Sequence, residues 1–443
     1  MAALPKEVMY NKPMASLPAD TQCLNVIVRP SNNQTANAGG DIIQFDLPSH
    51  SFLVPSSMTL RGVINHKPSA DGKKDHIFGV PGASWIQRLE TIVGGNLIES
   101  INGYNKLYNM IGMTKLSVDE KISLATELCI GGSDTVKDTA IKTDDAMGRT
   151  LLKSNAATNT YPFAIPLGCL LASCGELVPL GLMGGVRIQL TTAAISSFLE
   201  FETATPAEFN VTNMELNFDL VSFGAAMDGV VASMADSEGN LILKSQGWNL
   251  NDIATTTAAN SAQDLIFNTR LSSIKSLVYQ GSPGFYTNDA GKIPDMVAPQ
   301  VQGPTGTTQF FVASTPYPPT PLREANTAAV KSELRQAFGE IHDVYTTKAS
   351  IQPDTWNGPN TLVGATMNLI LPSAPPSHFV GVNTEKLSTN AVMLSGVSSQ
   401  LSPINVRLIP SVASNASFTS TLYACYDAIV AINVPTRTIA VRV

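Results

Sequence analysis

The side chains that most often carry catalytic or metal chemistry are few and scattered in this sequence. The five histidines never lie at a spacing typical of metal ligands: His50, His66, His76, His342 and His378. No H-E-x-x-H, C-x-x-C, G-x-S-x-G, P-loop or G-x-G-x-x-G motif occurs in the sequence. Because catalysis needs titratable groups that are brought together, we expect no enzyme, no bound metal and no cofactor.

Two pairs of residues have a spacing that would suit chemistry, and each has a simpler explanation. Cys169 and Cys174 resemble half of a zinc site, but no second pair follows, so two buried thiols are favoured. Glu200 and Glu202 share one face of a strand, a spacing open to acid–base catalysis. Without a partner motif, a hydrated strand edge is favoured for them. Neither pair changes the expectation that catalytic and metal-binding residues are absent.

The remaining motif-like segments indicate structure rather than chemistry. His342-Asp343 would orient an imidazole, yet a solvated polar pair at a helix end is favoured. Gly94-Gly95-Asn96 is typical of a hairpin turn rather than a phosphate cradle. Gly181-x-x-x-Gly185 has no long apolar helix to carry a helix-dimer motif. The run Pro316–Pro321 is interpreted as an extended surface loop in preference to a polyproline ligand.

The composition describes a chain with a large core and few surface charges. Apolar residues make up 44% of the 443 residues, enough for a packed core, and intrinsic disorder is excluded. Charged residues make up only 14%, against roughly 25% in ordinary soluble domains. A net charge of −7 without a basic stripe argues against a sequence-specific nucleic-acid binder. We therefore expect protein partners, with much of the exterior covered by copies of the same chain.

The cysteines and the apolar segments bear on the compartment. Five cysteines, an odd number widely spaced, do not form a disulfide framework, and buried free thiols are expected. The first ten residues lack an apolar core behind a basic start, which predicts a protein made and kept in the cytoplasm. Glu176, Pro179 and five glycines interrupt the apolar stretch 167–186. That stretch is therefore predicted to form two short strands joined by a loop rather than a membrane helix.

Alternation of apolar and polar residues dominates the chain and predicts antiparallel β-strands. Between 214 and 220, Leu216 and Phe218 fall on one face, while Asn217 and its polar neighbours fall on the other. The pattern recurs in five further runs, with apolar members Leu24, Val26, Val28; Ile43, Phe45, Leu47; Val186, Ile188, Leu190; Ile404, Val406, Leu408; and Ile439, Val441, Val443. Clusters of Gly, Pro, Asn and Ser separate these runs, as in an all-β sandwich or barrel.

Helical periodicity appears in three places only. Ser117 and Glu120 form a capping box at the start of one helix, which Gly131-Gly132 would end. A shorter helix is expected just before it, at 103–113. The third spans about 326–341, with an apolar stripe of Val330, Leu334, Phe338 and Ile341. We expect these helices as insertions between strands.

The two halves of the chain repeat one order of predicted elements. The corresponding segments are strands at 41–48 and 264–269, at 58–65 and 273–280, and at 214–223 and 418–434, with helices at 103–129 and 326–341. Each half holds about 200 residues, an ordinary size for one β-domain. A linker is predicted near 225–245, where Gly, Asp and Ser gather.

Four passages carry a resemblance to a known family. They are Trp85–Ile101, followed by a helix with Tyr and Leu; Tyr161–Leu190, which contains Ile-Pro-Leu, Val-Pro-Leu and Val-Arg-Ile-Gln-Leu; Asp264–Gln280; and Thr421–Ile432. Together, in this order and in a duplicated chain, they resemble the double jelly-roll major capsid proteins of tailless icosahedral DNA viruses, the lineage of adenovirus hexon, tailless phages and virophages. The resemblance spans roughly residues 40–443.

This resemblance implies a fold and its domains. We expect an all-β protein with two tandem eight-stranded antiparallel jelly-roll barrels and a few short inserted helices. Residues 1–22 are predicted to be an N-terminal arm and 23–230 the first jelly roll, with helices near 103–129. Residues 231–443 are predicted to be the second, with a loop insertion at 282–325 and a helix near 326–341.

The resemblance also implies a function and partners. The subunit would form a homotrimer, a pseudo-hexameric capsomer that tiles an icosahedral virion shell assembled in the host cytoplasm or nucleus. Its partners would be neighbouring capsomers, penton and minor capsid proteins and an internal membrane, with no sequence-specific nucleic acid. The family brings no catalytic, cofactor or metal residues. In the arm, Pro5, Pro13 and Pro18 lie among apolar residues, and we expect it to become ordered against protein beneath the shell.

Three alternative functions remain open at this point. A penton or minor capsid protein would commonly have a single barrel, so the duplication argues against it. A β-rich adhesin or carbohydrate-binding protein should carry a signal sequence or exposed aromatic platforms, and only 3 Trp are present. A cupin-type enzyme would need clustered histidines, which this sequence lacks.

Overall fold

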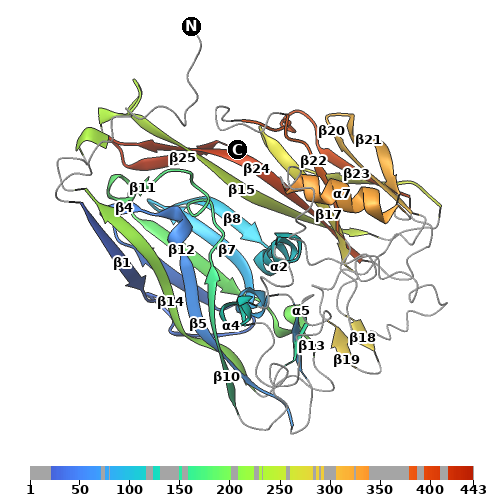
Figure 1. Cartoon of the computed structure of the whole chain (residues 1–443), viewed down its shortest axis with the longest axis horizontal. Coiled ribbons are helices and arrows are strands. Elements are labelled where there is room, and N and C mark those ends of the chain that lie inside the picture. The colour runs from blue at the N-terminus through green and yellow to red at the C-terminus, as the bar shows by residue number, and fades with distance from the viewer. Residues whose placement is uncertain are drawn as a thin grey trace, which may run out of the picture.

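The computed structural model describes most of the chain. The described residues are 21–70, 75–78, 80–115, 123–129, 149–151, 158–200, 208–223, 229–231, 233–255, 260–282, 286–288, 291–293, 306–323, 326–338, 379–386, 394–409 and 418–442. Figure 1 shows two β-rich halves side by side, with the first half at the left and the second at the right. The long strands of the second half extend along the upper edge of the first half in this view.

The first half contains two rows of antiparallel strands. One row runs β1 (Gln22–Val28), β14 (Glu208–Ser222), β5 (Thr59–Lys67), β10 (Asn159–Pro166). The other runs β3 (Ile42–Leu47), β12 (Val186–Thr192), β7 (Ile86–Val93), β8 (Asn96–Asn102). Short strands extend the first row, namely β2 (Thr35–Asn37), β4 (Phe52–Leu53) and β11 (Val178–Pro179). A separate small sheet holds β6 (His76–Phe78), β9 (Arg149–Leu151) and β13 (Leu199–Glu200).

The second half repeats these two rows. One runs β15 (Asn240–Thr255), β24 (Phe418–Asn433), β17 (Ile274–Ser282), β22 (Phe379–Asn383), and β25 (Thr438–Arg442) pairs with β24. The other runs β16 (Gln263–Phe267), β23 (Ile404–Ile409), β20 (Thr307–Val312), β21 (Thr315–Arg323). A hairpin of β18 (Tyr286–Asn288) and β19 (Gly291–Ile293) lies outside both rows.

The order of the main strands is the same in both halves. Counted along the chain, one row joins the first, eighth, third and sixth strands, and the other joins the second, seventh, fourth and fifth. Two antiparallel sheets that face each other with these crossing connections are a jelly roll. The prediction of a duplicated, mainly β chain is therefore confirmed, and the structure adds that equivalent strands pair in the same way in both halves.

The core between the rows is built from the predicted alternation. Leu216 and Phe218 of β14 are fully buried, and the apolar members of the runs at 43–47, 186–190 and 404–408 are also buried. Leu24 was expected on an inner face with Val26 and Val28, but it is 45% exposed. The reason is position: β1 pairs on one side only, with β14, so it forms an edge that the core covers poorly.

The inserted helices occupy equivalent places in the two halves. α2 (Tyr104–Lys115) follows the fifth main strand of the first half, and α7 (Thr327–Ala337) follows the fifth main strand of the second. The Asn326 carboxamide oxygen caps α7 by accepting from the amide N of Ala329 at 3.2 Å. Val330 and Leu334 are buried, as the apolar stripe predicts. Ser117, Glu120, Gly131-Gly132 and Ile341 lie outside the described residues.

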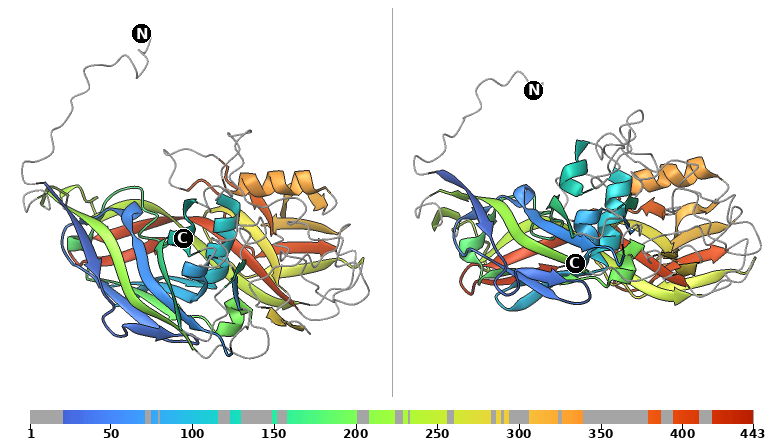
Figure 2. Two further views of the ribbon diagram at one scale, coloured as in Figure 1. Left: turned by 60° about the horizontal axis from the view of Figure 1, so that its bottom comes forward. Right: turned by 90° about the horizontal axis from the view of Figure 1, so that it is seen from below.

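Short helical turns complete the fold. They are η2 (Pro55–Ser57), α1 (Pro81–Ser84), α4 (Ala125–Leu128), η4 (Leu180–Leu182) and α5 (Ile195–Phe198). None of the helices in the described part of the chain is long and apolar enough to cross a membrane. Figure 2 shows α2 and α7 on the same side of the molecule as seen from two further directions.

The predicted loop insertion at 282–325 is wrong over much of its length. Thr307–Val312 is a central strand of its sheet, with Phe310 and Val312 fully buried. The proline run forms part of β21, which pairs with β20 on one side only. Prolines lack the amide donor, so they are tolerated in an edge strand whose outer side needs no ladder partner. Residues 294–305 of the predicted loop lie outside the described residues.

Three smaller expectations also change. The stretch 167–186 contains turns, the two-residue strand β11 and η4 before β12 begins, rather than two joined strands. The predicted arm of residues 1–22 overlaps β1, which begins at Gln22, and residues 1–20 lie outside the described residues. The linker predicted at 225–245 overlaps β15, because Asn240–Thr255 pairs along its whole length with β24.

The glycine pair at 94–95 forms the predicted hairpin. Gly94 and Gly95 have φ angles of +57° and +83° between β7 and β8, where Val93 pairs with Asn96. A two-residue turn that matches the twist of its strands needs positive φ at both positions. Gly181 and Gly185 are not on a common helix, so no helix-dimer motif exists there.

Candidate functional site: the junction and the exposed edges

The cysteines are free in the structure, and four of the five are buried. Cys129, Cys169, Cys174 and Cys425 are buried, whereas Cys23 is exposed on the edge strand β1, contrary to the expectation of buried thiols. Burial raises the pKa of the Cys174 thiol to about 11, so it stays protonated and unreactive near neutral pH. Within the described residues, no group of three or more His, Cys, Asp or Glu side chains is placed to hold a metal ion.

The other pairs considered for chemistry are not assembled into a site by the described structure. Glu200 ends the short strand β13, and Glu202 lies outside the described residues. His342 and Asp343 also lie outside them. In the described part of the chain, three other buried polar clusters come together, which the sequence patterns did not indicate.

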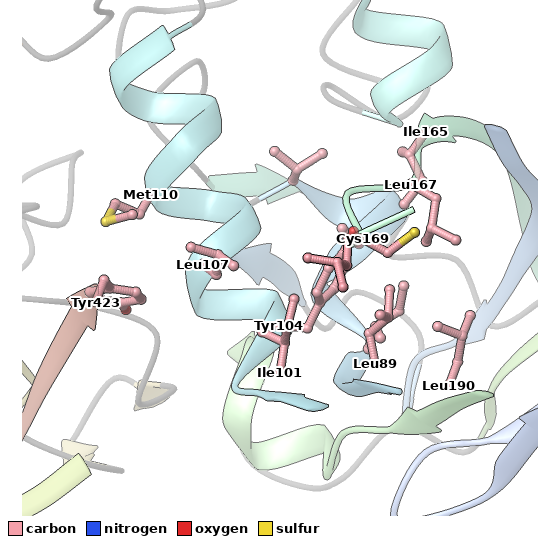
Figure 3. Close-up of a cluster of buried hydrophobic side chains, with 14 of the residues drawn as sticks. Leu89, Ile101, Tyr104, Leu107, Met110, Ile165, Leu167, Cys169, Leu190 and Tyr423 are labelled. Carbon is pink, nitrogen blue, oxygen red and sulfur yellow. The ribbon is translucent and has the colours of Figure 1, made fainter. Parts of the chain in front are cut away.

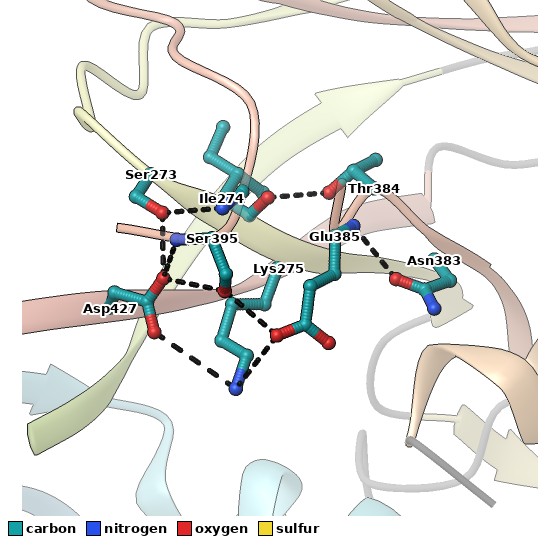
Figure 4. Close-up of polar contacts among 9 residues, drawn as sticks. Ser273, Ile274, Lys275, Asn383, Thr384, Glu385, Ser395 and Asp427 are labelled. Carbon is teal, nitrogen blue, oxygen red and sulfur yellow. Dashed lines mark hydrogen bonds and ion pairs between the residues drawn. The ribbon is translucent and has the colours of Figure 1, made fainter. Parts of the chain in front are cut away.

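The first cluster surrounds Asp427 in the second half (Figure 4). Asp427 of β24 is fully buried, and its Oδ2 accepts from Ser273 Oγ at 2.7 Å and from the amide N of Ser395 at 2.7 Å. Lys275 Nζ lies 3.5 Å from Glu385 Oε1 and 4.0 Å from Asp427 Oδ1. The serine hydroxyls donate to carboxylates, so they are not activated as nucleophiles. The cluster ties β17, β24 and the segment at 394–396 together.

The second cluster is a buried histidine–aspartate pair in the first half. His66 Nε2 of β5 lies 2.8 Å from Asp75 Oδ2, and both side chains are almost completely buried. The other ring nitrogen, Nδ1, has no hydrogen-bond partner. A carboxylate orients the imidazole as in catalytic triads, but no described nucleophile hydrogen-bonds to the ring. The pair therefore joins β5 to the start of β6 without forming a catalytic arrangement.

The third cluster lies where the two halves meet. Glu99 of β8 is buried, and its Oε2 accepts from the amide N of Leu170 at 2.8 Å and from Thr91 Oγ1 at 3.0 Å. The carbonyl oxygen of Leu170 accepts in turn from Ser245 Oγ of β15 at 2.6 Å. The turn at 167–175 thus connects a carboxylate of the first half to a strand of the second.

Apolar packing surrounds this junction. Tyr104 and Leu107 lie on the inner side of α2, toward Leu167 and Cys169 (Figure 3). The Tyr104 hydroxyl accepts from the amide N of Gly168 at 2.9 Å, which fixes the start of the turn. Burial raises the pKa of Glu99 to about 7, because a charged carboxylate loses hydration in these surroundings.

Most of the exposed large apolar residues in the described part of the chain lie on strands. Leu24 and Ile27 on β1 are 45% and 50% exposed, and Ile42 lies on the neighbouring β3. In Figure 1, β1 lies at the outer margin of the first half, far from the second. The second half exposes Ile242, Ile266, Leu401 and Ile409. A strand with one unpaired edge and exposed apolar side chains is a surface suited to protein contact.

Comparison with known proteins relates this architecture to solved structures. Neither a protein-family model nor a curated protein sequence matches the chain. A chain of the PBCV-1 virus capsid superposes with a TM-score of 0.59 at 10% identity, over 98% of this chain and 99% of the other. The Faustovirus major capsid protein gives 0.58 at 10% identity, over 97% and 92%. The mavirus major capsid protein gives 0.52 at 11% identity, over 100% and 95%.

These superpositions cover both halves at once. A match over nearly the full length of each chain requires the same two jelly rolls in the same succession, and the strand order described above meets that requirement in each half. The chain therefore has the double jelly-roll fold of viral major capsid proteins.

Proposed function

We propose that the chain is a major capsid protein, a non-enzymatic subunit that trimerises into pseudo-hexameric capsomers of an icosahedral virion shell. The supporting observation is the superposition of two jelly rolls over the whole chain on capsid proteins of several viruses. Three copies around a three-fold axis would present six similar barrels, and a six-sided unit tiles a flat facet.

The surface of the molecule supports self-assembly. Charged residues are only 14% of the chain, so few charges would need partners when subunits cover one another. The edge strand β1 offers Leu24 and Ile27 for contact. An obligate interface of this kind buries on the order of 2,000–5,000 Å². The partners would be two further copies of the chain, neighbouring capsomers, penton and minor capsid proteins, and an internal membrane beneath the shell.

The proposal includes a division of the chain. We place the first eight-stranded jelly roll within 23–230 and the second within 231–443, with an N-terminal arm that ends just before β1. Every described strand pairs only with strands of its own half, which supports a boundary between β14 and β15. The short strands β2, β4, β11 and β25 are additions to the eight main strands of their halves.

The rival functions have less support. A penton or minor capsid protein with a single barrel does not account for the repeated strand order. A carbohydrate-binding surface would use exposed aromatic rings. Of the two tryptophans in the described part of the chain, Trp85 is buried and Trp248 is half-buried against Phe338, with ring centroids 6.1 Å apart.

Native mass measurement and negative-stain microscopy test the proposal together. The purified full chain should have three times the mass of the 46.9 kDa subunit and appear as hexagonal particles with three-fold symmetry. Dispersed monomers at micromolar concentration would refute the capsid proposal. Ile27→Lys should weaken association if β1 is a contact surface, and Ser237→Lys, which adds the same charge in an exposed turn, serves as the control. Normal association of both variants would exclude β1 from the contacts.

A further inference from the structure

A cavity of about 570 Å³ lies at the junction of the two halves. Its wall is formed by α2, α4 and the turn after β10 from the first half, and by β15 from the second. Most of the lining is apolar and includes Met58, Leu107, Ile111, Leu124 and Trp248. This volume falls within the range of roughly 300–1,000 Å³ that is typical of small-molecule sites.

The charged groups of this cavity are all of one sign. Among the described residues that line it, Glu99 and Glu127 are the only charged ones, and no lysine, arginine or histidine is present. Glu127 is exposed, whereas Glu99 is only 5% exposed. The cavity therefore combines an apolar wall with a negative group held away from bulk water.

The hydrogen bonding of Glu99 is incomplete. Its Oε2 accepts from Leu170 N and Thr91 Oγ1, but its Oε1 is buried and has no hydrogen-bond partner. A buried carboxylate oxygen without a donor is unfavourable, and each partner that it gains restores part of the lost hydration energy. The Tyr108 hydroxyl, which also lines the cavity, donates to the carbonyl oxygen of Pro166 instead. Because Oε1 is covered, a ligand in the cavity reaches it through a shift of the Glu99 carboxylate.

We propose that this cavity binds a small organic cation, an alkylamine-like molecule whose apolar body fills the space between α2 and β15 and whose ammonium group donates to Glu99. An ammonium carries three donors and a positive charge, which match an unpartnered carboxylate oxygen. The apolar body displaces water from the lining side chains. A carboxylic acid of the same length would place a second negative charge beside Glu99, and an alcohol would lack the charge.

The two halves contribute different parts of this site. Glu99 and the helical wall belong to the first half, whereas Gln246, Gly247 and Trp248 belong to β15 of the second. A bound cation would therefore contact both jelly rolls of one subunit. Binding would raise the stability of the folded chain by an amount that grows with the logarithm of the ligand concentration above its Kd.

Calorimetric titration of the full chain tests the proposal with three ligands that share one chain length. At pH 8, where Glu99 is mostly ionised, n-octylamine should bind saturably with one site per subunit, n-octanol should bind at least about tenfold more weakly, and octanoate should not bind. Equal binding of the amine and octanoate, or no saturable binding of the amine, would overturn the proposal.

Three variants locate the binding. Glu99→Gln should lower the affinity for n-octylamine about tenfold or more and leave that for n-octanol unchanged. Ala172→Phe should weaken binding of both, because Ala172 lines the cavity and the added ring takes up part of its space. Glu238→Gln, which removes an exposed carboxylate that does not line the cavity, is the control and should change the affinity less than about twofold.

The readouts remain decisive if one variant is unstable. Circular dichroism and thermal unfolding first establish which variants are folded. If Glu99→Gln does not fold, the comparison of n-octylamine, n-octanol and octanoate tests the proposal. It is made with the unchanged chain and with Ala172→Phe. An affinity for the amine that Ala172→Phe leaves unchanged would show that the ligand occupies another site, and would refute the proposal.

Discussion

Glu99 should make the stability of the protein depend on pH in the direction opposite to that of an ordinary surface carboxylate. Burial raises its pKa from 4.5 to about 7 in the folded chain. The protonated form is therefore favoured by folding, and the folded state loses stability as the carboxyl ionises. The contribution is fully present below pH 4.5 and is lost as the pH rises through 7. A difference of this size corresponds to about 3 kcal/mol.

The substitution Glu99→Gln isolates this effect. The amide keeps an oxygen that accepts from Leu170 N and Thr91 Oγ1, but it does not ionise. Its NH₂ group takes the place of the unpartnered Oε1, at a cost of about 1–3 kcal/mol that does not vary with pH. The stability difference between variant and unchanged chain should therefore shift by about 3 kcal/mol in favour of the variant between pH 4.5 and 8.

Urea denaturation at constant protein concentration measures this difference. Curves at several pH values give the free energy of unfolding for each chain, and a constant concentration keeps any contribution from subunit association fixed. The Glu127→Gln variant, which removes an exposed carboxylate on the same cavity, should follow the unchanged chain at every pH. Parallel pH profiles for the unchanged chain and Glu99→Gln would refute the argument, because they would place Glu99 in a hydrated environment.

Three further substitutions or deletions test the fold and the arm. Phe218→Ala removes a fully buried ring from β14 and should lower the free energy of unfolding by about 3–5 kcal/mol in the same urea assay; an unchanged midpoint would contradict its place between the sheets. Asp427→Ala leaves the Ser273 hydroxyl and the amide N of Ser395 without their acceptor and should cost about 3 kcal/mol or more. Asp264→Ala, which breaks the exposed pair with Arg407, should cost only about 0–1 kcal/mol, and equal losses would show that burial of Asp427 has no energetic consequence. Deletion of residues 2–18 should leave trimers intact by native mass measurement while impairing assembly into shells by electron microscopy, and normal particles from this truncation would exclude the proposed role of the arm.

Local pattern was enough to predict the strands and their duplication. Alternating side chains point to opposite faces of a strand, so runs such as 43–47 and 404–408 show their buried face without knowledge of their partners. The hairpin at Gly94-Gly95 and the helix at 327–337 depend on residues within one turn of each other. The helices were also placed correctly between equivalent strands, because the order of elements is a property of the chain.

Lateral position in the sheets could not be predicted from the same patterns. Leu24 lies in the same alternating pattern as the core residue Leu216, yet β1 has a neighbouring strand on one side only. The residues of the strand itself do not indicate how many neighbours it has. The prolines of the run Pro316–Pro321 argue against a β-strand when the sequence is considered alone. The run lies in an edge strand, however, where the amide donors that proline lacks need no partner on the outer side. Both errors arise because edge and centre are defined by partners distant in the sequence.

The sequence by itself therefore determined the class of fold, the succession of strands and the repetition of one domain in two halves, because each of these depends on short-range periodicity. Only the tertiary structure decided which polar groups share a site. Glu99 and Leu170 are hydrogen-bonded although they are 71 positions apart in the sequence, and Ser273 and Asp427 although they are 154 positions apart. Glu99 sits in an alternating strand like any polar residue, and its raised pKa arises only when the turn at 167–175 and β15 enclose it. Burial and hydrogen bonding depend on distance in space, which the strand pairing of the folded chain sets.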